Sequence, residues 1–83
     1  MKDVLERLKK VMIERLRLNI SPEDIAENTP LFGPEGIGLD SVDVLELIVG
    51  IKNEFGIEIT DRETAEKVFV DVGTVARFIK ENL

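Results

Sequence analysis

Residues 41–55 form a segment whose apolar side chains have helical spacing and cover most of a helix circumference. Asp40 is a favourable N-cap in front of this segment, and Gly56 can end it in a left-handed conformation. Such a helix either lies centrally in a core or exposes an apolar patch to a partner. Gly50 costs about 1 kcal/mol relative to alanine inside a helix, so we interpret it as a point of close packing against a neighbouring helix.

The flanking segments also have helical spacing, and no segment alternates for long enough to indicate a strand. Residues 3–18 carry one apolar stripe, and a capping box beginning at Thr60 predicts a short helix over about 61–67. A last helix opens at Asp71 or Gly73. We therefore predict an all-α fold, a four-helix bundle with a short third helix and antiparallel packing of the longer helices.

A long connection, residues 19–39, separates the first two helices. Ser21 begins a capping-box-like sequence that predicts one short helical turn over 22–27. Prolines and a glycine then block regular structure. We expect Leu31 and Phe32 to anchor this connection to the core.

The 83 residues predict a single domain, 1–83, with one small core. The chain has neither cysteine nor histidine, which excludes disulfides, thiolate metal sites, a cysteine nucleophile and the Ser-His-Asp triad. We therefore expect no catalytic residue and no metal site. The N-terminal segment lacks the apolar core of a secretory signal and no apolar run approaches a membrane span, so we expect a cytoplasmic protein without membrane insertion.

Acidic residues gather in the middle of the chain. The overall net charge is -6, but residues 18–66 hold twelve acids and two bases, a net charge of -10. This charge repels a nucleic-acid backbone, so no nucleic acid is expected as a partner. It fits either a solvated surface or a docking surface for basic partners, and charge alone does not choose between them.

Ser41 stands at the predicted start of the second helix, after an approach that contains Gly36 and Gly38. A helix N-terminus is the positive end of the macrodipole and favours an attached phosphate. We expect the two glycines to keep the approach flexible and the hydroxyl accessible. With no histidine to activate it, Ser41 fits an acceptor that another enzyme modifies; the alternative is that it only helps to start the helix.

The sequence around Ser41 resembles the signature of acyl carrier proteins. The matching residues are Leu39-Asp40-Ser41, Asp43, Glu46-Leu47, Glu54-Phe55-Gly56 and Ile57-Glu58-Ile59. Thr29–Phe32 and Phe69–Ile79 also resemble the loop anchor and the closing helix of that family, so the likeness covers nearly the whole chain.

The resemblance implies that Ser41 receives a 4′-phosphopantetheine arm from coenzyme A, and that acyl groups are carried on the arm as thioesters. A separate phosphopantetheinyl transferase would attach the arm, and magnesium would enter only through that transferase. Asp40 would cap the helix and help to position the transferase and its metal. The other implied partners are acyl-loading and chain-elongating enzymes with basic docking surfaces, and we expect the carrier itself to be a monomer.

Three groups of side chains receive roles from this resemblance. Four carboxylates would meet basic partners: Asp43, Glu46, Glu54 and Glu58. Three apolar side chains form a stripe beside the serine that is either a partner contact or ordinary core: Val42, Leu45 and Val49. Five are predicted as core, either as plain core packing or as core that also bounds a cleft for the acyl chain: Leu47, Ile51, Phe55, Ile59 and Val68.

Two departures from the family pattern bear on the pathway. Val42 replaces a common leucine, and Lys52 and Asn53 occupy a stretch that is often acidic in fatty-acid carriers. We therefore keep two alternatives: a specialised carrier for a polyketide-like or modified-lipid pathway, and a carrier for housekeeping fatty-acid synthesis. The alternatives are an aminoacyl or peptidyl carrier and, from another class, an unmodified acidic helical protein-interaction module.

Overall fold

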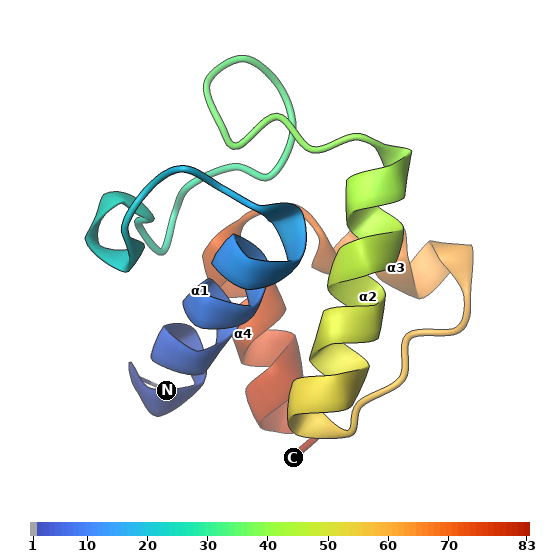
Figure 1. Cartoon of the computed structure of the whole chain (residues 1–83). Helices are drawn as coiled ribbons and strands as arrows, with labels where there is room; N and C mark the ends of the chain where they lie inside the picture. The colour runs from blue at the N-terminus through green and yellow to red at the C-terminus, as the bar shows by residue number, and fades with distance from the viewer. Residues whose placement is uncertain (1) are drawn as a thin grey trace.

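Four helices and one short turn make up the regular structure of residues 2–83, which are the residues that the computed structural model describes. They are α1 (Lys2–Leu16), the 3-10 turn η1 (Pro22–Asp24), α2 (Ser41–Phe55), α3 (Arg62–Val68) and α4 (Val72–Glu81). In Figure 1, α1 runs up the page, while α2 and α4 run down it. The prediction of an all-α four-helix bundle with a short third helix is confirmed, and the antiparallel pairs are those that α1 makes with α2 and α4.

Close packing between α1 and α2 explains the glycine in the middle of α2. A Cβ on Gly50 would lie 2.7 Å from Cγ1 of Val11 and 3.0 Å from Cγ of Arg15. Both neighbours belong to α1, so the glycine lets the two helices approach each other, as predicted. The fully buried Leu47 and Ile51 flank this contact on α2.

The predicted end of the first helix is wrong by two residues. The helix stops at Leu16, and Arg17 takes a left-handed conformation with φ of 52°. The amide of Leu18 then donates to the carbonyl of Ile13 over 3.1 Å, which is the bond of a Schellman motif. Glycine usually occupies the left-handed position of this motif, so a sequence with arginine there gives no sign of the stop.

Part of the long connection is correctly predicted and part is not. Its helical turn covers only Pro22–Asp24, because the chain becomes extended at Ile25. Leu31 is fully buried and its amide donates to the carbonyl of Val70, so this anchor is confirmed. Phe32 is 44% exposed and does not anchor the connection.

The last two helices begin at aspartates. Asp61, and not the predicted Thr60, caps α3: its carboxylate accepts from the amide and the hydroxyl of Thr64 at 2.9 and 2.8 Å. Asp71 caps α4 through the same pair of bonds to Thr74, at 2.7 and 2.8 Å, which selects Asp71 over Gly73 as the start. In both helices a threonine at the third position supplies the second donor.

The face of α4 that carries Val75 and Ile79 is buried against the rest of the core. No helix within residues 2–83 has both the length and the apolar character needed to cross a membrane.

Candidate functional site

Ser41 is the first residue of α2, and its side chain is exposed. A capping box fixes this end of the helix. The carboxylate of Asp40 accepts from the amide of Asp43 at 2.9 Å, and the carboxylate of Asp43 accepts from the amide of Asp40 at 3.1 Å. The cap predicted for Asp40 is confirmed, and the reciprocal bonds hold Ser41 in a defined position on the surface.

We predicted a flexible approach to Ser41, but the loop before α2 is closely packed and hydrogen-bonded. A Cβ on Gly36 would collide with the backbone carbonyl of Pro30, so the small residue is needed for contact with another part of the loop. The amide of Ile37 donates to the carbonyl of Pro30 at 3.0 Å, and the amide of Leu39 donates to the carbonyl of Leu31 at 2.9 Å. The loop therefore delivers Ser41 from a fixed base.

An apolar groove of about 910 Å³ opens beside Ser41, between α2, α3 and the loop before α2. Asp40 and Ser41 form part of its rim, and Thr60, Asp61, Arg62 and Glu66 supply the other polar groups. Eight apolar side chains line it: Phe32, Leu39, Val44, Leu45, Ile48, Ile59, Ala65 and Phe69. A groove of this volume and lining suits an apolar chain with one polar end.

The residues that line the groove differ from those that the sequence predicted for a cleft. Of the five residues assigned to the core and cleft, only Ile59 lines the groove. Leu47, Ile51 and Val68 are buried in the core away from it, and Phe55 is half-buried beneath Arg7, whose guanidinium carbon lies 4.6 Å from the ring centroid. The core assignment is thus confirmed for Leu47, Ile51, Ile59 and Val68, whereas their contact with an acyl chain stays a prediction.

Most of the groove lining was missed, although α2 carried a signal for part of it. Val44 and Ile48 follow Ser41 by three and seven residues, so they share its side of the helix. An apolar pair on the side of the proposed attachment residue marks the wall nearest to it. Nothing local identifies Phe32, Ala65 or Phe69, because the loop and α3 meet α2 only in the folded chain.

The apolar stripe on α2 lies on the surface. Val42, Leu45 and Val49 are 65, 63 and 45% exposed, which excludes the core interpretation for all three. Leu45 also lines the groove, so the stripe and the groove share an edge. A continuous exposed apolar surface beside Ser41 fits a contact with partner proteins.

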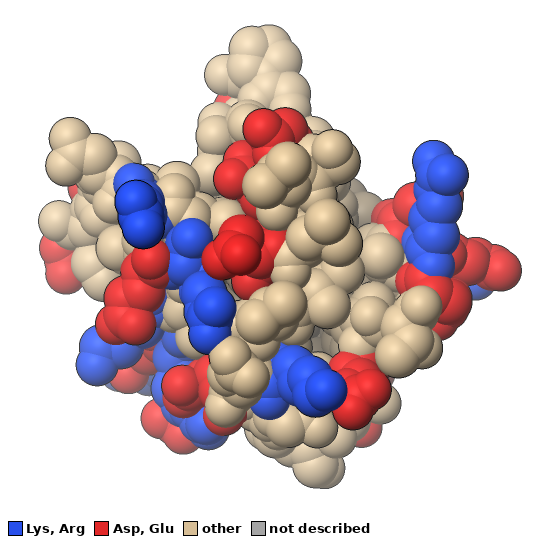
Figure 2. Space-filling model, turned by 45° about the vertical axis from the view of Figure 1, so that its right-hand side comes forward, with Lys and Arg blue, Asp and Glu red and all other residues tan. Residues whose placement is uncertain are grey.

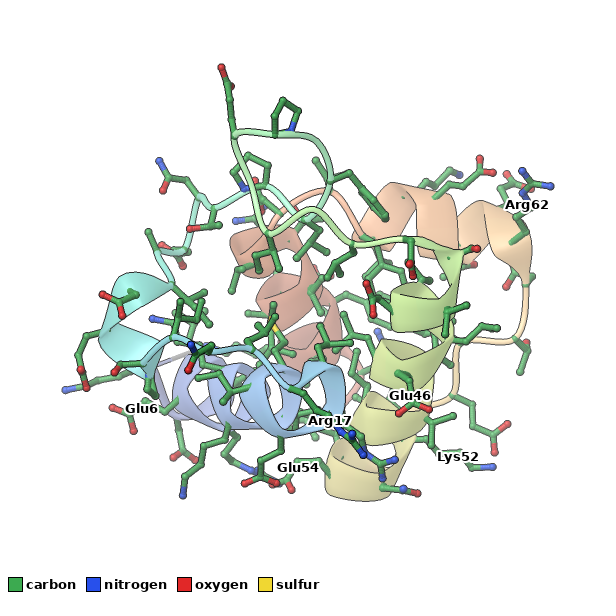
Figure 3. All side chains as sticks on the ribbon, turned by 45° about the horizontal axis from the view of Figure 1, so that its top comes forward. Glu6, Arg17, Glu46, Lys52, Glu54 and Arg62 are labelled. Atoms are coloured by element: carbon green, nitrogen blue, oxygen red, sulfur yellow. The ribbon has the colours of Figure 1, made fainter. Side chains whose placement is uncertain are left out.

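Three of the four predicted partner carboxylates are paired within the chain. Glu46, Glu54 and Glu58 lie 4.0, 2.9 and 3.3 Å from the nearest nitrogens of Arg15, Arg7 and Lys52, respectively. Figure 3 shows Glu46 and Lys52 on α2, with Glu54 where the helix passes α1. Asp43 stands apart from these pairs, in the capping box.

The arrangement is suited to displaying a covalently attached group. Among residues 2–83, no cluster of acidic side chains has the geometry of a metal site. The serine hydroxyl is exposed at the positive end of a helix, where an attached phosphate is favoured. An apolar groove begins next to it. The site therefore fits a covalently attached, phosphate-linked arm with an apolar cargo.

Comparison with known proteins gives the same answer. The family described as "Phosphopantetheine attachment site" matches residues 6–79. An acyl carrier protein from Phenylobacterium zucineum is 40% identical over 83 residues, which cover 100% of this chain and 98% of the relative. An acyl carrier protein from Wolinella succinogenes is 39% identical over 79 residues, 95% of this chain and 96% of the relative. One from Zymomonas mobilis is 37% identical over 68 residues, 82% of this chain and 81% of the relative.

Proposed function

The chain belongs to the acyl carrier protein family, whose members are carriers and not enzymes, and we propose that Ser41 holds its 4′-phosphopantetheine arm. The observation that carries this proposal is the position of Ser41: exposed, first in α2 and on the rim of an apolar groove. The chain has one other serine, Ser21, and that residue precedes a three-residue turn away from the groove.

A separate phosphopantetheinyl transferase would join the Ser41 oxygen to the phosphate of the arm, with coenzyme A as the donor. The pyrophosphate bond of coenzyme A breaks in this step, and adenosine 3′,5′-bisphosphate leaves. We assign to the transferase the base that takes the hydroxyl proton and the magnesium ion. Asp40 and Asp43 hold the end of the helix in place during this reaction. The arm supplies a thiol to which acyl groups attach as thioesters.

After loading, the side chains of this protein present and shelter the acyl group. Val44, Ile48 and Phe69 provide apolar surface close to the attachment point, and the exposed stripe on α2 meets acyl-loading and chain-elongating enzymes. Tethering raises the effective concentration of the cargo at each enzyme. A monomeric state and a cytoplasmic location stay predictions.

The class of cargo also remains a proposal. Lys52 is paired with Glu58 on the surface of α2, so this end of the helix is less acidic than the sequence suggests. We keep two cargo classes as proposals: polyketide-like or modified lipids, and the products of housekeeping fatty-acid synthesis. Mass spectrometry of the protein isolated from its source would distinguish an acyl cargo from an aminoacyl one.

The attachment site is tested by intact-mass measurement after co-expression with a phosphopantetheinyl transferase. We expect the wild-type chain to gain the mass of one arm, Ser41→Ala to gain nothing, and Ser21→Ala to gain as much as wild type. No gain in the wild type, or an undiminished gain in Ser41→Ala, would contradict the proposal. No gain in the wild type would favour an unmodified interaction module, whereas a gain in Ser41→Ala would place the arm on another residue.

A further inference from the structure

Among residues 40–58, carboxylates without a cationic neighbour lie only at the N-terminal end of α2. Five carboxylates lie between residues 40 and 58. Three of them have a cationic neighbour: Arg7 of α1 donates a hydrogen bond to Glu54, Glu58 lies 3.3 Å from Lys52, and Glu46 lies 4.0 Å from Arg15 of α1. The two without a basic side chain within 4 Å, among residues 2–83, are Asp40 and Asp43, which flank Ser41.

The pair nearest the C-terminal end of α2 is held in several ways. Nε of Arg7 donates to the Glu54 carboxylate at 2.9 Å, and a terminal nitrogen of Arg7 donates to the Glu54 backbone carbonyl at 3.1 Å. The same guanidinium lies over the ring of Phe55. A partner cation that approached Glu54 would therefore meet an arginine already in place. The sequence of α2 alone cannot show this, because Arg7 is 47 positions away.

Apolar surface fills the space between these charges. Figure 2 shows uncharged surface descending the middle of this face, with acidic and basic atoms side by side along its edges. Val42, Leu45 and Val49 supply large exposed apolar side chains on this helix. Desolvating an apolar surface is favourable, whereas an ion pair exposed to this extent gives a partner little net attraction.

From this arrangement we propose that the partners of α2 dock through a mainly apolar patch with one cationic site, placed opposite Asp40 and Asp43. This inference rests on the proposed function. It limits the basic docking surface expected on each partner enzyme to a single site that faces the carboxylates beside Ser41. An extended basic strip on the partner would face Arg7, Arg15 and Lys52 as well as the carboxylates. The charges on α2 are thus complementary to a basic site only at the end where the arm is attached.

The experiment measures steady-state loading of the full chain by the phosphopantetheinyl transferase of the same organism, with coenzyme A in excess. Salt is varied between about 20 and about 400 mM, over which the Debye length falls from about 20 to about 5 Å. We expect KM for the carrier to change by less than about threefold over this range, because only one charged contact is screened.

Two matched pairs of variants separate the contribution of apolar contact to KM from the contribution of charge. Val49→Ser should raise KM by about five- to tenfold with kcat unchanged, while Val70→Ser, at a comparably exposed valine outside α2, should change KM by less than about twofold. Asp43→Asn should raise KM by about threefold, whereas Glu54→Gln should leave it within about twofold. Urea unfolding of each variant checks that the fold is intact.

The possible results distinguish this inference from the proposed function. Normal loading with a KM that rises tenfold or more with salt, with Asp43→Asn and Glu54→Gln equally impaired, would overturn the docking inference alone. Equal effects of Val49→Ser and Val70→Ser would also overturn it. Failure to load any arm on wild type would overturn the proposed function, and the docking inference would fall with it.

Discussion

At the scale of single residues, Gly50 shows how tertiary contact overrides helix propensity. Alanine is intrinsically favoured over glycine in a helix by about 1 kcal/mol. Here its methyl group would meet the branched side chain of Val11 at 2.7 Å, and a valine cannot move aside as the end of a flexible side chain can. The contact fixes the distance between α1 and α2, and therefore also the geometry of the ion pairs that join them.

We predict that Gly50→Ala lowers the free energy of unfolding by about 1 kcal/mol, since overpacking costs about 1–3 kcal/mol against a propensity gain of about 1 kcal/mol. Urea denaturation followed by circular dichroism measures the change as a lower midpoint with the same m-value. Asn53→Ala, at an exposed position on the same helix, is the control and should leave stability unchanged or slightly raised. A stabilised Gly50→Ala protein would show that the two helices can separate without cost.

At the scale of elements, the start of α4 depends on one carboxylate. Hydrogen bonds from the amide and the hydroxyl of Thr74 lower the pKa of Asp71. The same residue lies at the bridge where the long connection pairs with the α3–α4 junction, through Pro30. Loss of this cap would therefore disturb both the last helix and the base of the loop that leads to Ser41.

The sign of the pH effect follows from the lowered pKa. The folded pKa lies below the unfolded value of about 3.9, so the stabilisation is present in full above that value. It is lost as the pH falls through the folded pKa. We predict that Asp71→Ala costs about 1 kcal/mol at pH 7 and clearly less near pH 3, measured by urea unfolding at both values. Asp71→Asn keeps an N-cap residue that has no ionisable carboxyl group. Its difference in unfolding free energy from the wild type should therefore also become smaller in acid. A cost of Asp71→Ala that is equal at both pH values would contradict this assignment.

At the scale of the whole molecule, the sequence predicts what lies within one segment better than what lies between segments. The bounds of α2, its cap at Asp40 and the close approach at Gly50 follow from local patterns. The walls of the groove do not, because Phe32 and Ala65 reach α2 only when the loop and α3 fold against it. The pairing of Glu54 with Arg7 is hidden for the same reason.

The groove connects the whole fold to the cargo. An acyl chain at the end of the arm on Ser41 that folds back into the groove removes methylene groups from water, at about 0.8 kcal/mol for each one buried. Unfolding would expose these groups again, so the loaded cargo should stabilise the folded chain. The size of this effect reports how much of the cargo the groove shelters.

We predict that the melting temperature rises with the length of a saturated acyl chain on the arm, by roughly 5–10 °C once about two methylenes are buried. Differential scanning calorimetry of the holo form and of successive acyl forms measures the rise. Ala65 is half-buried and lines the groove, so Ala65→Leu should place a larger side chain in the path of the cargo and reduce the dependence on chain length. Ala26→Leu, at an exposed residue outside the groove, makes the same change in size and should retain the full dependence. A melting temperature independent of chain length in the wild type would mean that the cargo remains in solvent. The groove would then shelter nothing, although Ser41 would still carry the arm.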